Sequence, residues 1–306
     1  MRLFVRLVFI FVLILNSHWL FSQSISKLDT TTKTSFKIQL DYLNNYVYNG
    51  RADSIFSPYQ ITTATVNFAN GIYANFIANY LLTPDQSRFD FFEFDLGYEY
   101  NLGKRISGEI YGSKYFFSNQ SSLLNGDITS DFGATINYDL GLFQFNNTFD
   151  IFFSSKSDFQ FMPGIEKGFE FGKNNSKWEI TPGIYSVFST LNYYESVFTR
   201  KQNAQKNLKN KSAPPANIQS ITSLVDKGFK LLNIECSIPI SYNYGAFSFI
   251  FTPTLAIPFN PIKTITENRA TLLNGNVNTN TFDSTPYSDR NLTNQFYFQI
   301  GVNYKF

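Results

Sequence analysis

The feature that most constrains this chain is a strict alternation of apolar and polar residues in segments of about ten residues. The last segment has an apolar face and a mostly polar face: Phe296, Phe298, Ile300, Val302, Tyr304 and Phe306 against Tyr297, Gln299, Gly301, Asn303 and Lys305. A period of two residues is that of a β-strand and not of a helix. The chain is therefore expected to be an all-β protein.

The same pattern predicts twelve strands along the chain. Their expected ranges are 35–48, 58–69, 71–81, 88–101, 104–117, 127–140, 142–153, 158–171, 177–190, 228–242, 246–258 and 294–306. The pattern is weakest in the second and third ranges, whose apolar faces include Thr, Ala and Asn. Four prolines lie inside expected strands: Pro163, Pro182, Pro239 and Pro253. Because proline donates no ladder hydrogen bond, each is expected to mark a bulge or a strand end.

The connections between these strands alternate between long and short. The long ones are 49–57, 82–87, 118–126, 154–157, 191–227 and 259–293, and the short ones, rich in Asn and Gly, are 70, 102–103, 141, 172–176 and 243–245. Only 154–157 departs from the length rule. An even number of strands with all long loops at one end is typical of a transmembrane antiparallel up-and-down β-barrel. Closure also satisfies every backbone N–H and C=O within hydrocarbon.

The N-terminus has the pattern of a secretory signal. Arg2 and Arg6 precede an unbroken apolar run over residues 7–15, and a polar, small-residue stretch follows. A bilayer-spanning helix takes about 20 apolar residues, so an uncleaved anchor is the weaker alternative. We expect residues 1–22 to be a signal peptide, 23–34 a short periplasmic tail and 35–306 the barrel.

Together, the signal and the last strand resemble those of Gram-negative outer-membrane β-barrel proteins. The alternating aromatics that end in Tyr304 and Phe306 resemble the signal read by the barrel-assembly machinery of that class. The resemblance implies the cell outer membrane as location, and its lipid and lipopolysaccharide together with the assembly machinery as partners. It points to no subfamily, and it carries no functional residue over.

Composition argues against several other classes of protein. Aromatic residues make up 18% of the chain and charged residues only 16%, below the roughly 25% of a typical soluble domain. Without Arg2 and Arg6, 25 − 2 = 23 basic residues balance 23 acidic ones, so bulk charge does not favour nucleic acid. The one histidine, His18, lies in the expected signal, which leaves a serine nucleophile without its usual base. The single Cys236 is expected to face lipid. We expect no catalytic activity, cofactor or metal.

The alternation places many carboxylates on the inward face of the predicted barrel. The candidate lumen-lining residues are Glu93, Asp95, Glu99, Glu109, Asp131, Asp150, Glu166 and Glu170, and the clear basic residues on that face are Lys37 and Lys305. Rings of Asp and Glu favour cations, but a solvated wall with no selectivity role is an open alternative. The inward face also carries bulky residues that would fill a narrow lumen: Phe89, Phe91, Tyr111, Tyr115, Phe152, Met162, Tyr185 and Tyr297.

These features predict a narrow passive channel for small solutes with a lumen biased to cations. The alternative is a non-conducting barrel that binds partners through its long loops; a membrane enzyme is a distant third. The loop 191–227 has a basic cluster: Arg200, Lys201, Lys206, Lys209, Lys211 and Lys227. It is either a mobile surface loop, a contact for anionic lipopolysaccharide or a partner, or an inward constriction. The loop 259–293 is rich in Asn and Thr, which predicts a solvated loop and little else.

Overall fold

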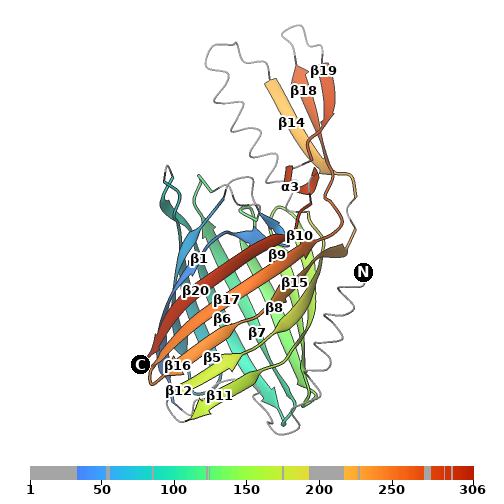
Figure 1. Cartoon of the computed structure of the whole chain (residues 1–306). Helices are drawn as coiled ribbons and strands as arrows, with labels where there is room; N and C mark the ends of the chain where they lie inside the picture. The colour runs from blue at the N-terminus through green and yellow to red at the C-terminus, as the bar shows by residue number, and fades with distance from the viewer. Residues whose placement is uncertain are drawn as a thin grey trace.

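The computed structural model describes residues 33–52, 56–84, 86–121, 123, 125–173, 176–192, 217–226, 228–271, 277–285, 287–290 and 292–306. Within them, fifteen strands form one antiparallel sheet, and three pairs of these strands each make one interrupted strand, so the ring has twelve positions. The positions are β1 (Ser35–Leu43), β4 (Tyr59–Asn67), β5 (Ile72–Leu81), β6 (Arg88–Leu102), β7 (Ile106–Phe117), β8 (Ser130–Asp139), β9 (Gln144–Phe153), β10 (Ser157–Glu166) with β11 (Phe169–Lys173), β12 (Ser176–Ile180) with β13 (Gly183–Ser189), β15 (Lys230–Ser237) with β16 (Ile240–Tyr244), β17 (Phe247–Pro258) and β20 (Gln295–Lys305). Because β20 pairs with both β17 and β1, the sheet is a closed barrel (Figure 1). The expected signal and nearly all of the expected tail lie outside the described residues.

The twelve predicted strands are confirmed. The two weakest expected ranges form β4 and β5, which pair from Tyr59 with Leu81 to Asn67 with Tyr73. The last strand, β20, joins the two ends of the sheet, and the backbone N–H of Phe306 donates to the carbonyl of Phe36 over 2.8 Å. No helix among the described residues is long and apolar enough to cross a membrane.

The two faces of the barrel wall differ in the way the alternation predicts. Along β8, Phe132 and Ile136 point outward and are 53% and 43% exposed, whereas Asp131 points inward and is 7% exposed. The same division of apolar outside and polar inside recurs on β1, β6, β17 and β20. A soluble domain buries its apolar face, so this inverted distribution is the one that lipid on the outside requires.

Two of the four prolines mark strand ends, and the barrel wall stays joined beside them. Pro182 separates β12 from β13, and Pro239 separates β15 from β16. Their carbonyls accept hydrogen bonds from Lys167 N at 3.0 Å and Thr181 N at 2.9 Å, so neighbouring strands remain connected across each break. Pro163 and Pro253 lie within β10 and β17, where the strands are not interrupted.

A β-bulge corrects one predicted orientation. The register between β5 and β6 shifts beside Asn79, so that Asp90 is an extra residue between Phe89 and Phe91. Phe89, expected inside, therefore points outward; it is 56% exposed, and its ring packs 5.4 Å from that of Phe92. Asp90 and Phe91 are both buried. Bulges re-aim side chains in this way because they break the two-residue period.

The long and short connections lie at opposite ends of the barrel, here called the loop end and the turn end. The C-terminus lies at the turn end (Figure 1). Gly71, Gly103, Gly141 and Gly245 in four short turns all have positive φ, as tight hairpins require.

The two longest connections are more ordered than predicted. β14 (Asn217–Leu224), β18 (Thr264–Thr271) and β19 (Val277–Asp283) form a separate sheet that projects from the loop end, followed by the short helix α3 (Tyr287–Arg290) (Figure 1). Thr222 and Thr266 are buried in this sheet, with their hydroxyl oxygens 2.8 Å apart. The prediction that 259–293 is solvated is confirmed for β19, whose residues are all exposed, and wrong for Ile262, Thr264 and Thr266, which are buried. The basic cluster of the other loop (positions 200–211 and 227) lies outside the described residues.

Candidate functional site: the barrel lumen and its closed loop end

The described structure brings five of the eight candidate carboxylates together. Glu93, Asp95, Glu109, Asp131 and Asp150 lie on the inner side of four neighbouring strands, β6 to β9; we call them the acidic wall. Asp95 and Asp131 lie at one level, because each is the register partner of Ser113 on β7. The charged neighbours of Glu93 are Asp95 and Asp131, and those of Asp150 are Asp131 and Glu109. Carboxyl groups are therefore concentrated on one side of the lumen.

Two oxygens of the acidic wall have no hydrogen-bond partner in the described structure: Asp95 Oδ1 and Asp131 Oδ1. Both residues are more than nine-tenths buried, at 9% and 7% exposure. Asp95 Oδ2 accepts from Asn75 Nδ2 at 3.2 Å. Buried carboxylate oxygens without donors are unfavourable unless water or a cation meets them. These two buried acceptors are therefore the positions on the wall where a water molecule or a cation would be most stabilising.

Tyrosines line the wall without projecting across the lumen. Tyr73 on β5 lies over Gly97 on β6, where an added Cβ would be only 2.4 Å from Tyr73 Cζ. Its hydroxyl then donates to Glu109 Oε2 on β7 at 2.7 Å. The ring thus uses the space that glycine leaves and holds a carboxylate two strands away.

The arrangement recurs for Tyr111 of β7, which lies over Gly133 of β8 and whose hydroxyl is 2.5 Å from Asp150 on β9. Tyr185 of β13 also lies over a glycine, Gly164 of β10, but its carboxylate partner Glu166, at 2.5 Å, is on the same strand as that glycine. Each of these rings therefore lies against the wall at a glycine. The alternation in the sequence predicts that these tyrosines face inward. It does not predict that each one lies over a glycine of the adjacent strand.

Of the remaining candidate carboxylates, Glu99 is the register partner of Glu109, and Glu166 and Glu170 lie near the turn end, where basic groups are also present. Glu170 Oε2 is 3.9 Å from Lys177 Nζ, in a pair that is about half exposed. Glu99 and Asp41 are charged neighbours of Lys37, which is the register partner of Lys305. The turn end of the lumen therefore carries both signs of charge, unlike the acidic wall.

At the loop end, the first long connection folds back over the lumen. β2 (Val47–Tyr48) and β3 (Arg51–Ala52) form a hairpin whose tip, Asn49 and Gly50, has φ values of 51° and 75°. Asn-Gly is the sequence that a two-residue turn with positive φ favours. Gly50 packs against Asn233 of β15, where an added Cβ would come within 2.5 Å of the Asn233 Cβ. The hairpin therefore reaches the wall formed by β15.

Arg51 of this hairpin forms a buried ion pair with Asp289 of α3. Arg51 Nε lies 2.8 Å from Asp289 Oδ1, and the two side chains are 1% and 0% exposed. The rest of the guanidinium donates to backbone carbonyls, those of Asn49, Leu232, Phe259 and Asn260. Asp289 Oδ1 also accepts from Ile262 N at 3.0 Å. We call this set of contacts the latch, because it joins the first and last long connections.

Apolar side chains pack where the long connections meet the barrel. One cluster of buried residues consists of Ile128, Phe152, Leu191, Leu224, Leu232 and Ile262, with Tyr48 and Tyr115 packed against it. A second consists of Tyr59, Leu81, Phe91 and Leu123, with Leu43, Tyr46, Ile61 and Phe117. Both clusters combine inward strand residues with residues of the long connections. The hydrophobic contacts therefore hold these connections down onto the end of the barrel.

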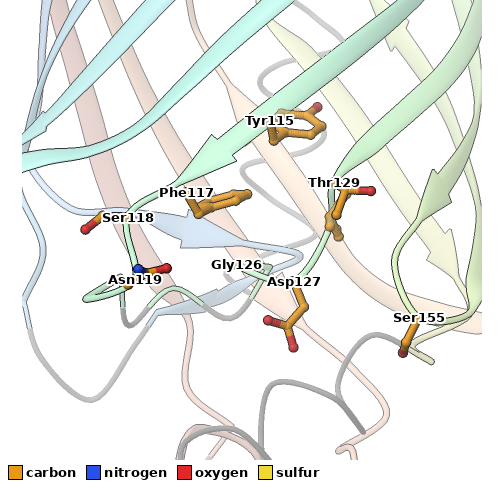
Figure 2. Close-up of a pocket in the computed structure, with 9 residues that line it drawn as sticks. Tyr115, Phe117, Ser118, Asn119, Gly126, Asp127, Thr129 and Ser155 are labelled. Carbon is orange, nitrogen blue, oxygen red and sulfur yellow. The ribbon is translucent and has the colours of Figure 1, made fainter.

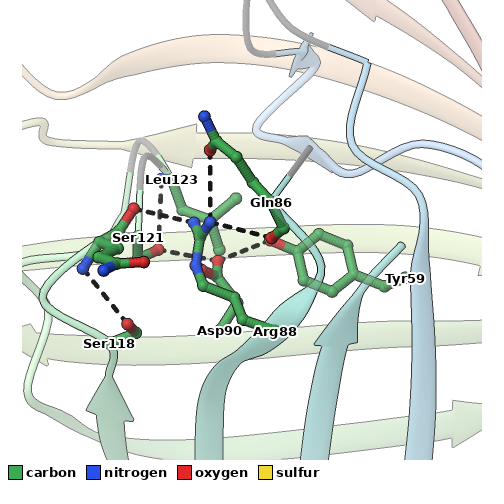
Figure 3. A network of polar contacts seen from close by, with 8 residues as sticks. Tyr59, Gln86, Arg88, Asp90, Ser118, Ser121 and Leu123 are labelled. Carbon is green, nitrogen blue, oxygen red and sulfur yellow. Dashed lines mark hydrogen bonds and ion pairs between the residues drawn. The ribbon is translucent and has the colours of Figure 1, made fainter. Parts of the chain in front are cut away.

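The third long connection is tied to the wall through the bulge residue Asp90 (Figure 3). Asp90 Oδ2 accepts hydrogen bonds from Tyr59 at 2.7 Å and from Ser121 at 2.9 Å. Asp90 Oδ1 is 2.8 Å from Arg88 Nη2, which also donates to the carbonyl of Gln120. The described part of loop 118–129 is thereby tied to β6 and, through Tyr59, to β4. Among the described residues, no group of three or more His, Cys, Asp or Glu side chains is placed to hold a metal ion.

Comparison with known proteins gives no family assignment. No protein-family model matches the chain, and no curated protein matches its sequence. Among solved structures, it is similar to a porin (12% identity, 90% of this chain and 99% of that one, TM-score 0.26). It is also similar to CdiB from Acinetobacter baumannii (10% identity, 90% and 60%, TM-score 0.33) and to a bacterial polysaccharide outer-membrane secretin (8% identity, 90% and 99%, TM-score 0.31). At these identities and TM-scores, the likenesses carry no residue role or activity over to this chain.

Proposed function

We propose that this protein is an outer-membrane barrel that acts as a narrow, cation-favouring channel for small solutes, gated by the long connections that pack at its loop end. The observation that carries the proposal is the acidic wall inside a barrel whose outer face is apolar. We also propose that residues 1–22 direct export and that Tyr304 and Phe306 guide insertion into the membrane. The barrel would then be surrounded by lipid and lipopolysaccharide. No catalytic reaction is assigned.

Cation preference follows from where the charge lies. Glu93, Asp95 and Asp131 are charged neighbours of one another on one side of the lumen, so a cation passing them gains attraction and an anion meets repulsion. The basic groups described above are nearer the turn end. They reduce the preference for cations at the turn end but do not cancel it along the acidic wall.

Passage requires the loop end to open. The latch connects the hairpin to α3, and the apolar clusters pack beneath it, so opening must separate Arg51 from Asp289 or move both together. A closed resting state is also what favours the second candidate function. In that reading the barrel does not conduct, and the projecting sheet of β14, β18 and β19 binds a surface partner.

Single-channel recording of the refolded protein in planar bilayers separates the two candidates. We expect wild-type protein to be mostly closed and Arg51→Ala to open more often, because the substitution removes the latch. Arg290→Ala is the matched control, since Arg290 follows Asp289 directly but pairs with Asp283 at the exposed surface, at 3.5 Å. Absence of conductance from all three proteins, each shown to be folded and inserted, would reject the channel and leave the binding function.

A further inference from the structure

A pocket opens at the loop end beside the closure. Its volume is about 400 Å³, and it lies between β7, loop 118–129 and the short loop at 154–156. Tyr115 and Phe117 of β7 supply aromatic rings, and Asp127 and Ser155 project from the two loops that border the opening (Figure 2). Pockets of this volume are within the range that small organic ligands occupy.

The lining has the chemistry of a site for an organic cation. Its single charged residue is the carboxylate of Asp127, and no Lys or Arg lines it. The rings of Tyr115 and Phe117 are 6.1 Å apart and nearly parallel, at 28°. Aromatic faces attract quaternary and substituted ammonium groups, and a carboxylate adds the opposite charge. Inorganic cations are less well matched, because rings and a single carboxylate do not replace a hydration shell.

The pocket is anchored on both sides of Asp127. Ile128, the next residue, is 2% exposed and belongs to the first apolar cluster, and its N–H donates to the carbonyl of Asn125 over 3.0 Å. Tyr115 N donates to the carbonyl of Thr129 over 3.0 Å, which ties the loop to β7 next to the rings. The backbone that follows Asp127 is therefore fixed beside β7, next to the two rings.

We propose that this pocket binds a small organic ammonium compound at the loop end of the barrel. The inference deepens the proposed function, on which it rests, by naming the class of solute. Tyr115 connects the two sites, because it lines the pocket and also lies beside Glu93 of the acidic wall. A cation released inward from the rings would meet the acidic wall next.

Isothermal titration of the folded protein in a non-ionic detergent tests the site with choline chloride as probe. The matched ligand is 3,3-dimethyl-1-butanol, which has the shape of choline without its charge. We expect saturable choline binding, with much weaker binding of the alcohol. Asp127→Asn should weaken choline about threefold or more, and Phe117→Leu roughly two- to fivefold. Asn119→Asp, which adds a carboxylate to the lining, should strengthen it.

Asp226→Asn is the control, because Asp226 is an exposed loop-end carboxylate paired with Lys230, outside the pocket. Unchanged choline affinity in Asp127→Asn, or equal affinity for the alcohol, would overturn the proposal, as would binding of glucose in place of choline. The outcome is independent of conductance. Choline binding without conductance in any variant would reject only the channel, and cation-selective conductance without choline binding would reject only this site.

Discussion

Arg51 and Asp289 are 238 positions apart in the sequence, yet their side chains form a fully buried ion pair at the loop end of the barrel, with Nε and Oδ1 2.8 Å apart. Each residue belongs to a long connection, and such connections commonly move. Burying both charges is unfavourable unless hydrogen bonds satisfy them. Four carbonyls satisfy the guanidinium and Ile262 N donates to Asp289 Oδ1, whereas Asp289 Oδ2 has no partner among the described residues. The pair therefore holds two loops in one defined arrangement.

Removing one partner of the latch should be costly. Arg51→Ala leaves the Asp289 carboxylate buried and unpaired, and we expect it to lower the free energy of unfolding by about 3–5 kcal/mol. Arg290→Ala, which breaks only an exposed pair, should lower it by less than about 1 kcal/mol. Urea unfolding in lipid vesicles measures both. Equal, small effects would show that the latch does not hold the loop end.

The orientation of β8 is tested by placing one arginine on each face. Ile136 faces outward and is 43% exposed, whereas Thr135 faces inward with its hydroxyl 3.1 Å from that of Thr148. Ile136→Arg should lower barrel stability by about 2–4 kcal/mol in a bilayer, and Thr135→Arg by much less. The same unfolding assay applies. If the two substitutions have equal effects, the assignment of faces is wrong.

The contact between Tyr73 and Gly97 predicts that a single methyl group added at position 97 lowers the stability of the barrel. An added Cβ at Gly97 would be 2.4 Å from Tyr73 Cζ, whereas at Gly112 the nearest atom would be 3.6 Å away. Gly97→Ala should therefore lower the free energy of unfolding by about 1–3 kcal/mol, as overpacking does. Gly112→Ala on the adjacent strand should be close to neutral. When Tyr73→Ala is already present, Gly97→Ala should lower the free energy of unfolding by less than it does alone. If the two substitutions have additive effects on that free energy, the contact does not contribute to stability.

Loss of Asp90 should release the third long connection. Asp90→Ala removes the acceptor for Tyr59, Ser121 and Arg88, and leaving such buried donors unpaired costs about 1–3 kcal/mol each. Hydrogen–deuterium exchange should then rise in loop 118–129 while β8 and β9 stay protected. Unchanged exchange in that loop would mean that the apolar cluster containing Leu123 is sufficient to hold it.

The barrel wall could be predicted because the alternation of apolar and polar residues along each strand is visible in the sequence. The last strand is the clearest case, and even β4 and β5 with their Thr and Ala residues were found. The period fails where a bulge inserts one residue, so Phe89 was assigned to the wrong face. A single sequence carries no marker for that insertion.

The acidic wall followed from the same period, but the latch did not. Arg51 and Asp289 look like ordinary loop charges in the sequence, since nothing local shows that they will meet. The pairing of Tyr73 with Gly97 depends on strand register, which alternation leaves open. What sequence reasoning missed is therefore what depends on contacts between distant segments.

The reversal potential of the Arg51→Ala variant in a planar bilayer with a potassium chloride gradient tests the central claim most directly. We predict a potential of the sign that cation selectivity requires, which moves toward zero when Glu93→Gln, Asp95→Asn and Asp131→Asn are added. An anion-selective potential, or one that the three neutralising substitutions leave unchanged, would contradict the assignment of the acidic wall as the selective part of the lumen.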